Sequence, residues 1–206
     1  MHEKKTFAEH LACVVRILSI PPVMITLLIL AVFLLRDDVF RSAAEAWWAV
    51  FFLALFPSMA YPVSWAVPDL RKKGREGQRN LAFLFSAAGY LGGFLYGALH
   101  VRRPEQMLIF TVYLFSLVLL ALCNRGLKRR ASGHACSVTG TVILAGWQFG
   151  MVGAAVGLLC YCVIFWSSMR AKRHTPAEFL LGTAVCAAAA LIGWILVISG
   201  DCFGLL

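Results

Sequence analysis

The chain has 206 residues, of which 61% are hydrophobic and 14% are charged, and its formal net charge is +9 at pH 7. This composition lies far outside the range of soluble globular domains and predicts an integral membrane protein. Because each helical span needs about 20 residues, the length leaves room for six or seven spans and for no soluble domain. We therefore expect a single domain over residues 1–206, an all-α membrane protein built as a polytopic bundle of six to seven transmembrane helices.

The predicted elements begin with an amphipathic segment over residues 2–16, a pattern suited to the membrane interface. No small-residue cleavage site follows it, so a removable signal peptide is not expected. Further along, residues 135–166 are too many for one ordinary span and predict two short helices hinged near Gly150 to Gly153. The expected crossings, seven in all, are residues 17–35, 46–66, 81–99, 107–123, two within 135–166, and 179–198.

Basic residues concentrate in three loops that span parity places on one side of the bundle. The loops contain Lys72 to Arg79, His134 and His174, and two crossings separate each loop from the next. With the N-terminus they hold 15 of the 19 Lys and Arg residues, and 12 remain when Lys72, Arg79 and Arg170 are set aside as possible ligands. The other side holds four, which are Arg36, Arg41, Arg102 and Arg103. The positive-inside rule therefore predicts that these loops and the N-terminus are cytoplasmic, and the expected location is a bacterial plasma membrane.

Small residues recur at four-residue spacing within the predicted spans, a pattern that favours close packing between helices of the bundle. A homodimer interface is the alternative. These residues are Gly89, Gly93, Gly97, Gly146, Gly150, Gly153 and Gly157. The seven cysteines show no repeated ligand spacing and are interpreted as buried small residues, so no bound metal is expected. Most of the basic loop residues are assigned to topology and to attraction for anionic membrane lipids, with no nucleic-acid partner.

Three ordered motifs lie in the basic loops. Lys72 is followed after six residues by Arg79; Ser132-Gly133-His134 comes next; Ser167 then precedes His174, which has an acidic residue four positions later. Their order resembles the motifs of the type 2 phosphatidic acid phosphatase superfamily, over roughly residues 61–199. The resemblance implies hydrolysis of a phosphate monoester or diphosphate through a phosphohistidine, without a metal or another cofactor.

The resemblance also implies a role for each motif residue. His174 is expected to be the nucleophile, and His134 is expected to protonate the leaving oxygen and then to activate water. Glu178 is expected to orient His174 from one helical turn away. Cations and neutral donors would hold the phosphate oxygens, and these are Lys72, Arg79, Ser132, Gly133 and Arg170.

The chain departs from the family pattern at four positions. Asn80 and Ala131 stand where the family has proline, and Glu178 stands for an aspartate. Ser168 stands where the family has an arginine, so one phosphate ligand is lost unless Arg170 reaches the same site. Glu178 also has a structural alternative, because the segment from Thr175 to Glu178 has the form of a helix capping box.

The expected substrate is a lipid phosphate, since the site would lie at the level of the lipid headgroups. Polyprenyl phosphate or diphosphate, phosphatidic acid and phosphatidylglycerol phosphate are all compatible. Two alternatives come from other classes of protein. One is a catalytically weak or inactive relative that binds or translocates anionic lipids, which Ser168 and the missing prolines favour. The other is a small transporter, which the scarcity of mid-span polar residues other than Gln148 disfavours.

Overall fold

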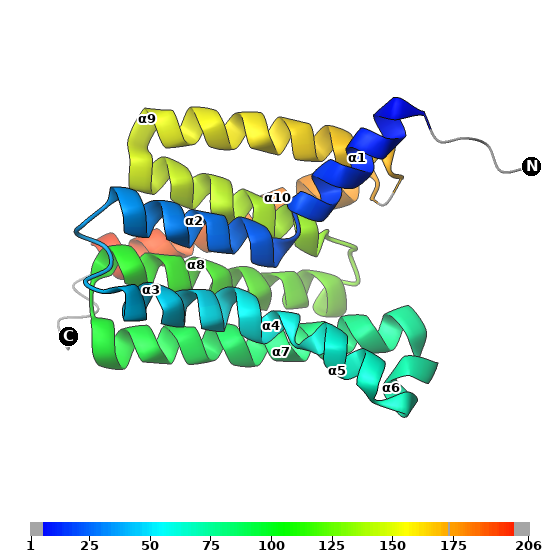
Figure 1. The fold of residues 1–206 in the computed structure, drawn as a ribbon, viewed down its shortest axis with the longest axis horizontal. Helices are drawn as coiled ribbons and strands as arrows, with labels where there is room; N and C mark the ends of the chain where they lie inside the picture. The colour runs from blue at the N-terminus through cyan, green and yellow to red at the C-terminus, as the bar shows by residue number, and fades with distance from the viewer. Residues whose placement is uncertain (1–5, 173, 200–206) are drawn as a thin grey trace, which may run out of the picture.

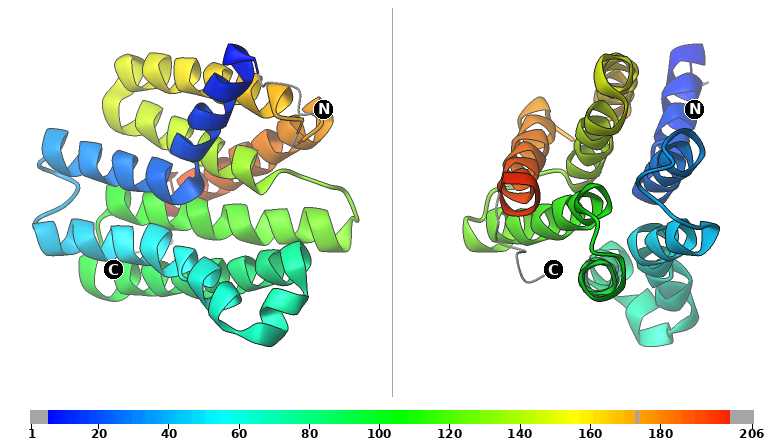
Figure 2. Two further views of the ribbon diagram at one scale, coloured as in Figure 1. Left: turned by 45° about the vertical axis from the view of Figure 1, so that its right-hand side comes forward. Right: turned by 90° about the vertical axis from the view of Figure 1, so that its left-hand side faces the viewer.

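The computed structural model describes residues 6–172 and 174–199, and within these ranges the chain forms helices joined by turns, with no strand. The chain runs back and forth along one axis, so the helices lie side by side as a bundle (Figures 1 and 2). By length and hydropathy, five helical segments could cross a membrane, and a sixth is added if the bent pair α1 and α2 counts as one span. The predicted all-α fold is confirmed for the described residues.

Several of the long apolar segments combine α-helix with single π-helical turns, labelled η. For example, α3 to α5 together form one candidate span, Ala43–Ala66. The elements are α1 Phe7–Leu18, α2 Pro21–Leu35, α3 Ala43–Val50, η1 Phe51–Leu55, α4 Phe56–Ser58, α5 Ala60–Ala66, α6 Pro68–Lys72, α7 Gly74–Tyr96, η2 Gly97–Val101, α8 Pro104–Ala121, η3 Leu122–Gly126, α9 Gly133–Arg170, α10 Pro176–Trp194 and η4 Ile195–Ser199.

The first predicted span is divided in the structure. α1 ends at Leu18, α2 begins at Pro21, and their axes are bent by 61°. Proline is accepted in the first turn of a helix but not in its interior, so Pro21 and Pro22 start a new helix rather than continue α1. Ile17 and Leu18 therefore belong to the N-terminal amphipathic helix and not to the span, which corrects the predicted boundary. Residues 2–5 of that amphipathic segment lie outside the described residues.

The predicted hinge within residues 135–166 is confirmed. Gly150 has φ 62° and ψ −143°, a backbone conformation that side chains other than hydrogen disfavour. The chain reverses there, and the two legs of α9 run antiparallel (Figure 1). The legs pack closely, because a Cβ on Gly153 would lie 2.1 Å from the carbonyl oxygen of Ala145. The hairpin thus supplies two of the seven apolar segments expected from the sequence.

The remaining glycine faces are also used inside the chain. A Cβ on Gly89 would lie 2.5 Å from the carbonyl oxygen of Phe52, and a Cβ on Gly97 would lie 2.6 Å from the sulfur of Met107. The prediction that small residues pack the bundle internally is confirmed for these faces, and a homodimer stays a prediction. Cys123, Cys136 and Cys186 are buried as expected, whereas Cys13, Cys160 and Cys162 lie on the outer surface and Cys202 lies outside the described residues.

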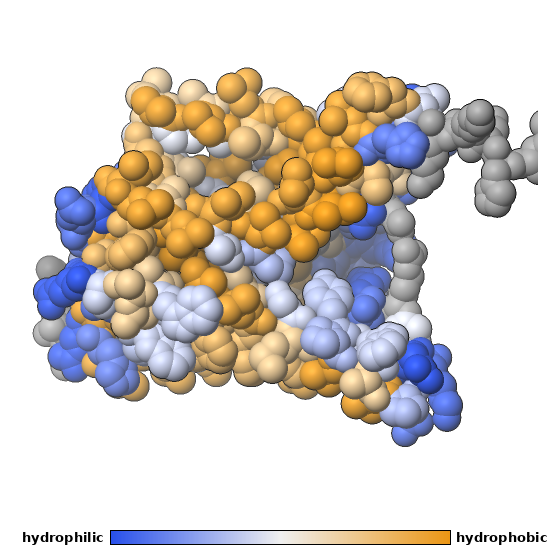
Figure 3. All heavy atoms as spheres, viewed as in Figure 1, coloured by the Kyte–Doolittle hydropathy of each residue, from blue (hydrophilic) through white to orange (hydrophobic). Residues whose placement is uncertain are grey.

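The outer surface is apolar over the middle of the bundle. Hydrophobic side chains cover this middle zone, and hydrophilic residues gather at the two ends (Figure 3). Leu34 and Val152 are each 72% exposed, and Leu159 is 69% exposed. A continuous apolar surface of this kind is rare on a soluble monomer and matches the environment of lipid tails. The surface is therefore consistent with an integral membrane protein.

Candidate active site

The three motif-bearing loops lie at the same end of the bundle, as span parity predicts. α1, α6, the loop before α9 and the start of α10 gather on the right of Figure 1, and the turns after α2, after η2 and between the legs of α9 lie on the left. We define the first group as the histidine end, made of residues 6–20, 66–80, 122–134 and 168–178. The second is the opposite end, made of residues 35–46, 97–106 and 145–153.

The loop before His134 is held by the side chain of Asn124. Its Oδ1 accepts a hydrogen bond from the Ala131 amide at 2.7 Å, and its Nδ2 donates to the Ala131 carbonyl at 3.3 Å. The first bond needs a backbone N–H, which the family's proline would lack. Ser132 then caps α9 by accepting a hydrogen bond from the amide of Ala135 at 3.2 Å. His134 therefore leaves the first turn of α9 in a fixed direction.

The start of α10 is anchored directly on the start of α9. The Ser132 amide donates to the carbonyl of Glu178 at 2.9 Å. One turn later, Gly182 approaches so closely that a Cβ there would lie 2.3 Å from the Ser132 carbonyl oxygen. Only a residue without a side chain fits between these two backbones. This contact brings together the helix that carries His134 and the helix that follows His174.

Glu178 completes the capping box and also lies beside His174. The predicted capping box is confirmed: Oε2 of Glu178 accepts from the Thr175 amide at 3.1 Å, and the Glu178 amide donates to the Thr175 hydroxyl at 3.2 Å. The same Oε2 lies 3.7 Å from Nδ1 of His174. That distance is too long for a hydrogen bond but short enough for an electrostatic interaction. Because Nδ1 faces the carboxylate, Nε2 is the ring nitrogen left for other chemistry.

The electrostatic surroundings of His174 favour a neutral ring. Burial lowers the pKa of His174 below its usual value near 6.5, Glu178 opposes this change, and Arg16 and Arg79 add to the lowering. A neutral imidazole carries a free lone pair, which is the form needed for nucleophilic attack. The charge of Arg79, on α7, therefore acts on the His174 ring, and its role as a phosphate ligand stays a prediction.

Sequence reasoning missed two residues of this site, Arg16 and Ser19, which both come from the last turns of α1. The Ser19 hydroxyl is buried and lies 3.4 Å from Nε2 of His134. The charge of Arg16 acts on the rings of both His134 and His174. The sequence indicates an amphipathic helix here, but its contact with α9 joins residues more than 110 positions apart.

The other predicted phosphate ligands lie in different surroundings. Lys72, at the end of α6, is 79% exposed, and its Nζ is 3.5 Å from Oδ1 of Asp69. Arg170 is exposed at the last turn of α9. Ser168, which stands where the family has an arginine, is buried. Gly133 is exposed as the first residue of α9, so its amide is one of those that a helix leaves without an internal partner.

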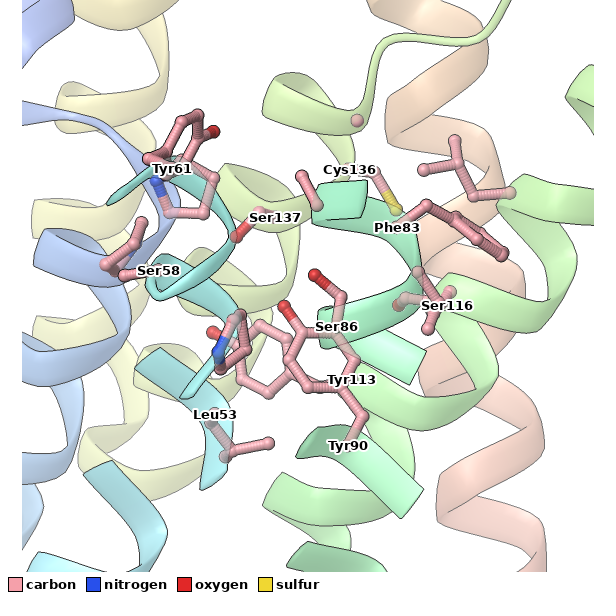
Figure 4. Close-up of a pocket in the computed structure, with 17 residues that line it drawn as sticks. Leu53, Ser58, Tyr61, Phe83, Ser86, Tyr90, Tyr113, Ser116, Cys136 and Ser137 are labelled. Atoms are coloured by element: carbon pink, nitrogen blue, oxygen red, sulfur yellow. The ribbon is translucent and has the colours of Figure 1, made fainter. Parts of the chain in front are cut away.

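A cavity of about 200 Å³ lies inside the bundle next to the first turns of α9. It lies between the start of α2, the α3–α5 segment, α7, α8 and the first turns of α9, where Gly133 and Ser137 line it. Figure 4 shows hydroxyl groups of Ser86 and Ser137 turned toward its interior. The Ser137 hydroxyl is buried without a hydrogen-bond partner among the described residues. The N-terminus of α9 therefore borders a largely apolar cavity that carries a few hydroxyl groups.

Comparisons with known proteins add no relative. No protein-family model matches the chain, and no curated protein or solved structure matches it either. Within residues 6–172 and 174–199, no group of three or more His, Cys, Asp and Glu side chains is arranged to hold a metal ion. The geometry of the histidine end and the motifs of the sequence are therefore the features that point to a function.

Proposed function

We propose that the protein is a membrane lipid-phosphate phosphatase of the bacterial plasma membrane, which hydrolyses a phosphate monoester or diphosphate of a lipid. One observation carries the proposal. His134 and His174, 40 positions apart in the sequence, lie at the same end of an apolar bundle, where the Ser132 amide donates to the Glu178 carbonyl at 2.9 Å and so joins the two helix starts beside them. The charges of Arg16 and Arg79 also act on His174. Two histidines and a set of cations are the groups that phosphoryl transfer through a phosphohistidine requires. The order of the motifs adds the resemblance to type 2 phosphatidic acid phosphatases.

The proposed reaction has two displacements. Nε2 of His174 attacks phosphorus, the bond from phosphorus to the leaving oxygen breaks, and His134 gives a proton to that oxygen. In the second step His134 takes a proton from water, the water oxygen attacks the phosphohistidine, and inorganic phosphate and His174 are released. Arg79 and the Gly133 amide bind phosphate oxygens at the N-terminus of α9, where the helix dipole favours negative charge. Glu178 holds the His174 ring by its Nδ1 side.

The surface of the bundle supports a lipid as the substrate. The outer surface is apolar over the middle of the bundle, and hydrophilic residues gather at its ends (Figure 3). A lipid whose tails contact the apolar zone would therefore place its headgroup phosphate at one of these ends. The excess of Lys and Arg at the histidine end supports a cytoplasmic orientation. Polyprenyl phosphate or diphosphate, phosphatidic acid and phosphatidylglycerol phosphate remain the candidate substrates.

The test is phosphate release by the full chain, purified in detergent with EDTA present. Each candidate lipid is supplied in turn, and release is expected from at least one of them, with inhibition by orthovanadate. His174→Ala is expected to abolish release, because it removes the nucleophile. His100→Ala, which changes an exposed histidine at the opposite end, is the matched control and is expected to leave the rate unchanged. Full turnover by the His174→Ala variant would disprove the proposal.

A second candidate function is binding or translocation of anionic lipids by a catalytically weak relative. Two observations favour it: Ser168 supplies no cation, and Lys72 is directed to Asp69 on the exposed tip of α6. The assay for this alternative is binding of the same lipids to the protein in nanodiscs. Tight binding of lipid phosphates together with no release from any of them would support the second function over the first.

A further inference from the structure

The inner face of α1 is attached to α9 at two points. The hydroxyl of Ser167, on the second leg of α9, donates to the carbonyl of Ala12 at 2.8 Å. Seven residues later, Ser19 meets His134 on the first leg. Residues separated by four and by seven positions share one face of a helix. Arg16, four positions after Ala12 and three before Ser19, therefore leaves α1 between these two contacts.

Arg16 is also distinguished by its burial. Among the Lys and Arg side chains that the structure describes at the histidine end, Arg16 is partly buried and all the others are exposed. A cation interacts more strongly with a ligand when water is partly excluded, because the effective dielectric constant falls. The charge of Arg16 acts on both histidine rings, which no other cation is seen to do among the described residues.

The outer face of α1 is apolar, which explains how this helix is held in the membrane interface. Phe7, Leu11, Val14 and Leu18 are 83%, 44%, 52% and 61% exposed and follow the spacing of one helical face. An amphipathic helix of this kind lies in the interface, with its apolar side toward the lipid tails and its polar side at headgroup level. Arg16 is then at the depth of a lipid phosphate.

We infer that Arg16 binds the phosphoryl oxygens of the substrate at the pair formed by His134 and His174. The inference deepens the proposed function and rests on it. Arg16 thereby supplies the cation that the sequence assigned to Arg170. Ser168 cannot supply it, and α1 covers the neighbouring Ser167. The planar guanidinium fits two phosphate oxygens at once, as lysine does not.

The experiment compares single variants of the full chain in nanodiscs that contain a substrate lipid. Arg16→Gln is expected to lower kcat/KM by about 100-fold or more, the usual effect of removing one donor to a transition-state oxyanion. Arg16→Lys is expected to recover part of that loss, which shows that the first variant did not simply misfold. Arg129→Gln removes the same charge from an exposed position at the same end, and is the matched control with an expected change of less than about threefold.

A second measurement is independent of turnover: the affinity of each variant for inorganic phosphate, measured by calorimetry. Arg16→Gln is expected to weaken it about tenfold, and Arg129→Gln to leave it unchanged. If the protein binds phosphate through Arg16 but never releases it from a lipid, the phosphatase proposal fails and this inference stands. The inference is overturned if Arg16→Gln matches the wild type in both measurements, if Arg170→Gln causes the larger loss, or if the wild type binds no phosphate.

Discussion

The two ends of the bundle differ in their balance of positive and negative charge. Over the described residues, the opposite end has four arginines and four acidic residues, whereas the histidine end has twelve Lys and Arg residues and four acidic ones. The charged residues of the opposite end are Arg36, Arg41, Arg102, Arg103, Asp37, Asp38, Glu45 and Glu105. Those of the histidine end are Arg16, Arg71, Lys72, Lys73, Arg75, Arg79, Arg125, Lys128, Arg129, Arg130, Arg170, Lys172, Glu9, Asp69, Glu76 and Glu178.

The ion pairs also differ between the two ends. At the opposite end Arg103 forms a half-buried ion pair with Glu45, and Arg36 pairs with Asp38 at 2.6 Å. These arginines are neutralised within the protein. Over the described residues, the histidine end carries eight more positive than negative charges, and this excess attracts anions from outside the protein. Under the proposed function, the charges of the opposite end stabilise the fold and those of the histidine end bind the ligand.

After His174→Ala, which should abolish release, the largest effect is expected from His134→Ala at the histidine end. Loss of a general acid typically costs 10² to 10⁴ in rate, or about 3–5 kcal/mol of the barrier. The loss should depend on the substrate: an aryl phosphate, whose leaving oxygen needs no proton, should be affected much less than a lipid phosphate. Steady-state kinetics with both substrates measures this difference. An equal loss for both would show that His134 does not act as the acid.

Gly182→Ala is expected to have the next largest effect. The added Cβ would meet a backbone carbonyl that cannot move aside, so α10 must shift away from Ser132. Overpacking of this kind costs about 3 kcal/mol, which lowers the midpoint of thermal unfolding by about 6–12 °C in a chain of this size. Activity should fall as well, because the shift separates His174 from His134. Gly126→Ala is the control, since a Cβ there meets nothing within 4 Å; equal destabilisation by both variants would contradict the prediction.

The contrast between these contacts shows what the sequence could and could not predict. Apolar runs and the spacing of glycines were sufficient to predict the helices and the hairpin at Gly150, because both depend on local periodicity and backbone freedom. His134, His174 and Glu178 were identified by the order of the motifs. Arg16, Ser19 and Asn124 were not, since their roles come from contacts between helices that are distant in the chain, and no local pattern records such contacts.

The departures from the phosphatase motifs also show that local sequence does not predict contacts between helices that are distant in the chain. Asn80 and Ala131 occupy positions of family prolines, and the sequence indicates only a change in loop rigidity. In the structure both positions form hydrogen bonds with the end of the α8–η3 segment: Asn80 accepts from Arg125 at 3.4 Å, and Ala131 is held by Asn124. Side-chain contacts hold both positions, and these contacts could be recognised only once α7, α8 and α9 were placed together.

A smaller effect is expected from Arg103→Gln at the opposite end. The variant leaves Glu45 partly buried without its cation. The side chains of Arg103 and Glu45 are 14% and 19% exposed, so the loss of stability should be about 2 kcal/mol, below that for a fully buried pair. The midpoint of thermal unfolding should fall by about 4–8 °C, and kcat should be unchanged in the folded protein. Arg129→Gln should change stability by less than about 0.5 kcal/mol. The division between the two ends would be wrong if Arg129→Gln were the more destabilising variant.

The smallest effect is a shift in the pH dependence caused by Glu178→Gln. Glutamine can still complete the capping box, so the variant removes the negative charge beside His174 while it keeps the helix start. That charge raises the pKa of His174 against the lowering by burial, so its removal lowers the pKa further. Since the nucleophile must be neutral, the acid limb of kcat/KM should lie below the pH expected of an ordinary histidine in the wild type, and it should move to still lower pH in the variant.

Arg16→Gln should move the same limb in the opposite direction, because a positive charge near His174 lowers its pKa and its loss raises it. Opposite shifts of the acid limb in the two variants would show that the charges of Glu178 and Arg16 both act on the ring of His174, as they do in the structure. If Glu178→Gln leaves the limb unmoved while Glu178→Ala lowers the unfolding temperature, the carboxylate acts through the capping box alone. The orientation of His174 would then depend on the backbone of α10, which Ser132 and Gly182 anchor, and not on a carboxylate beside it.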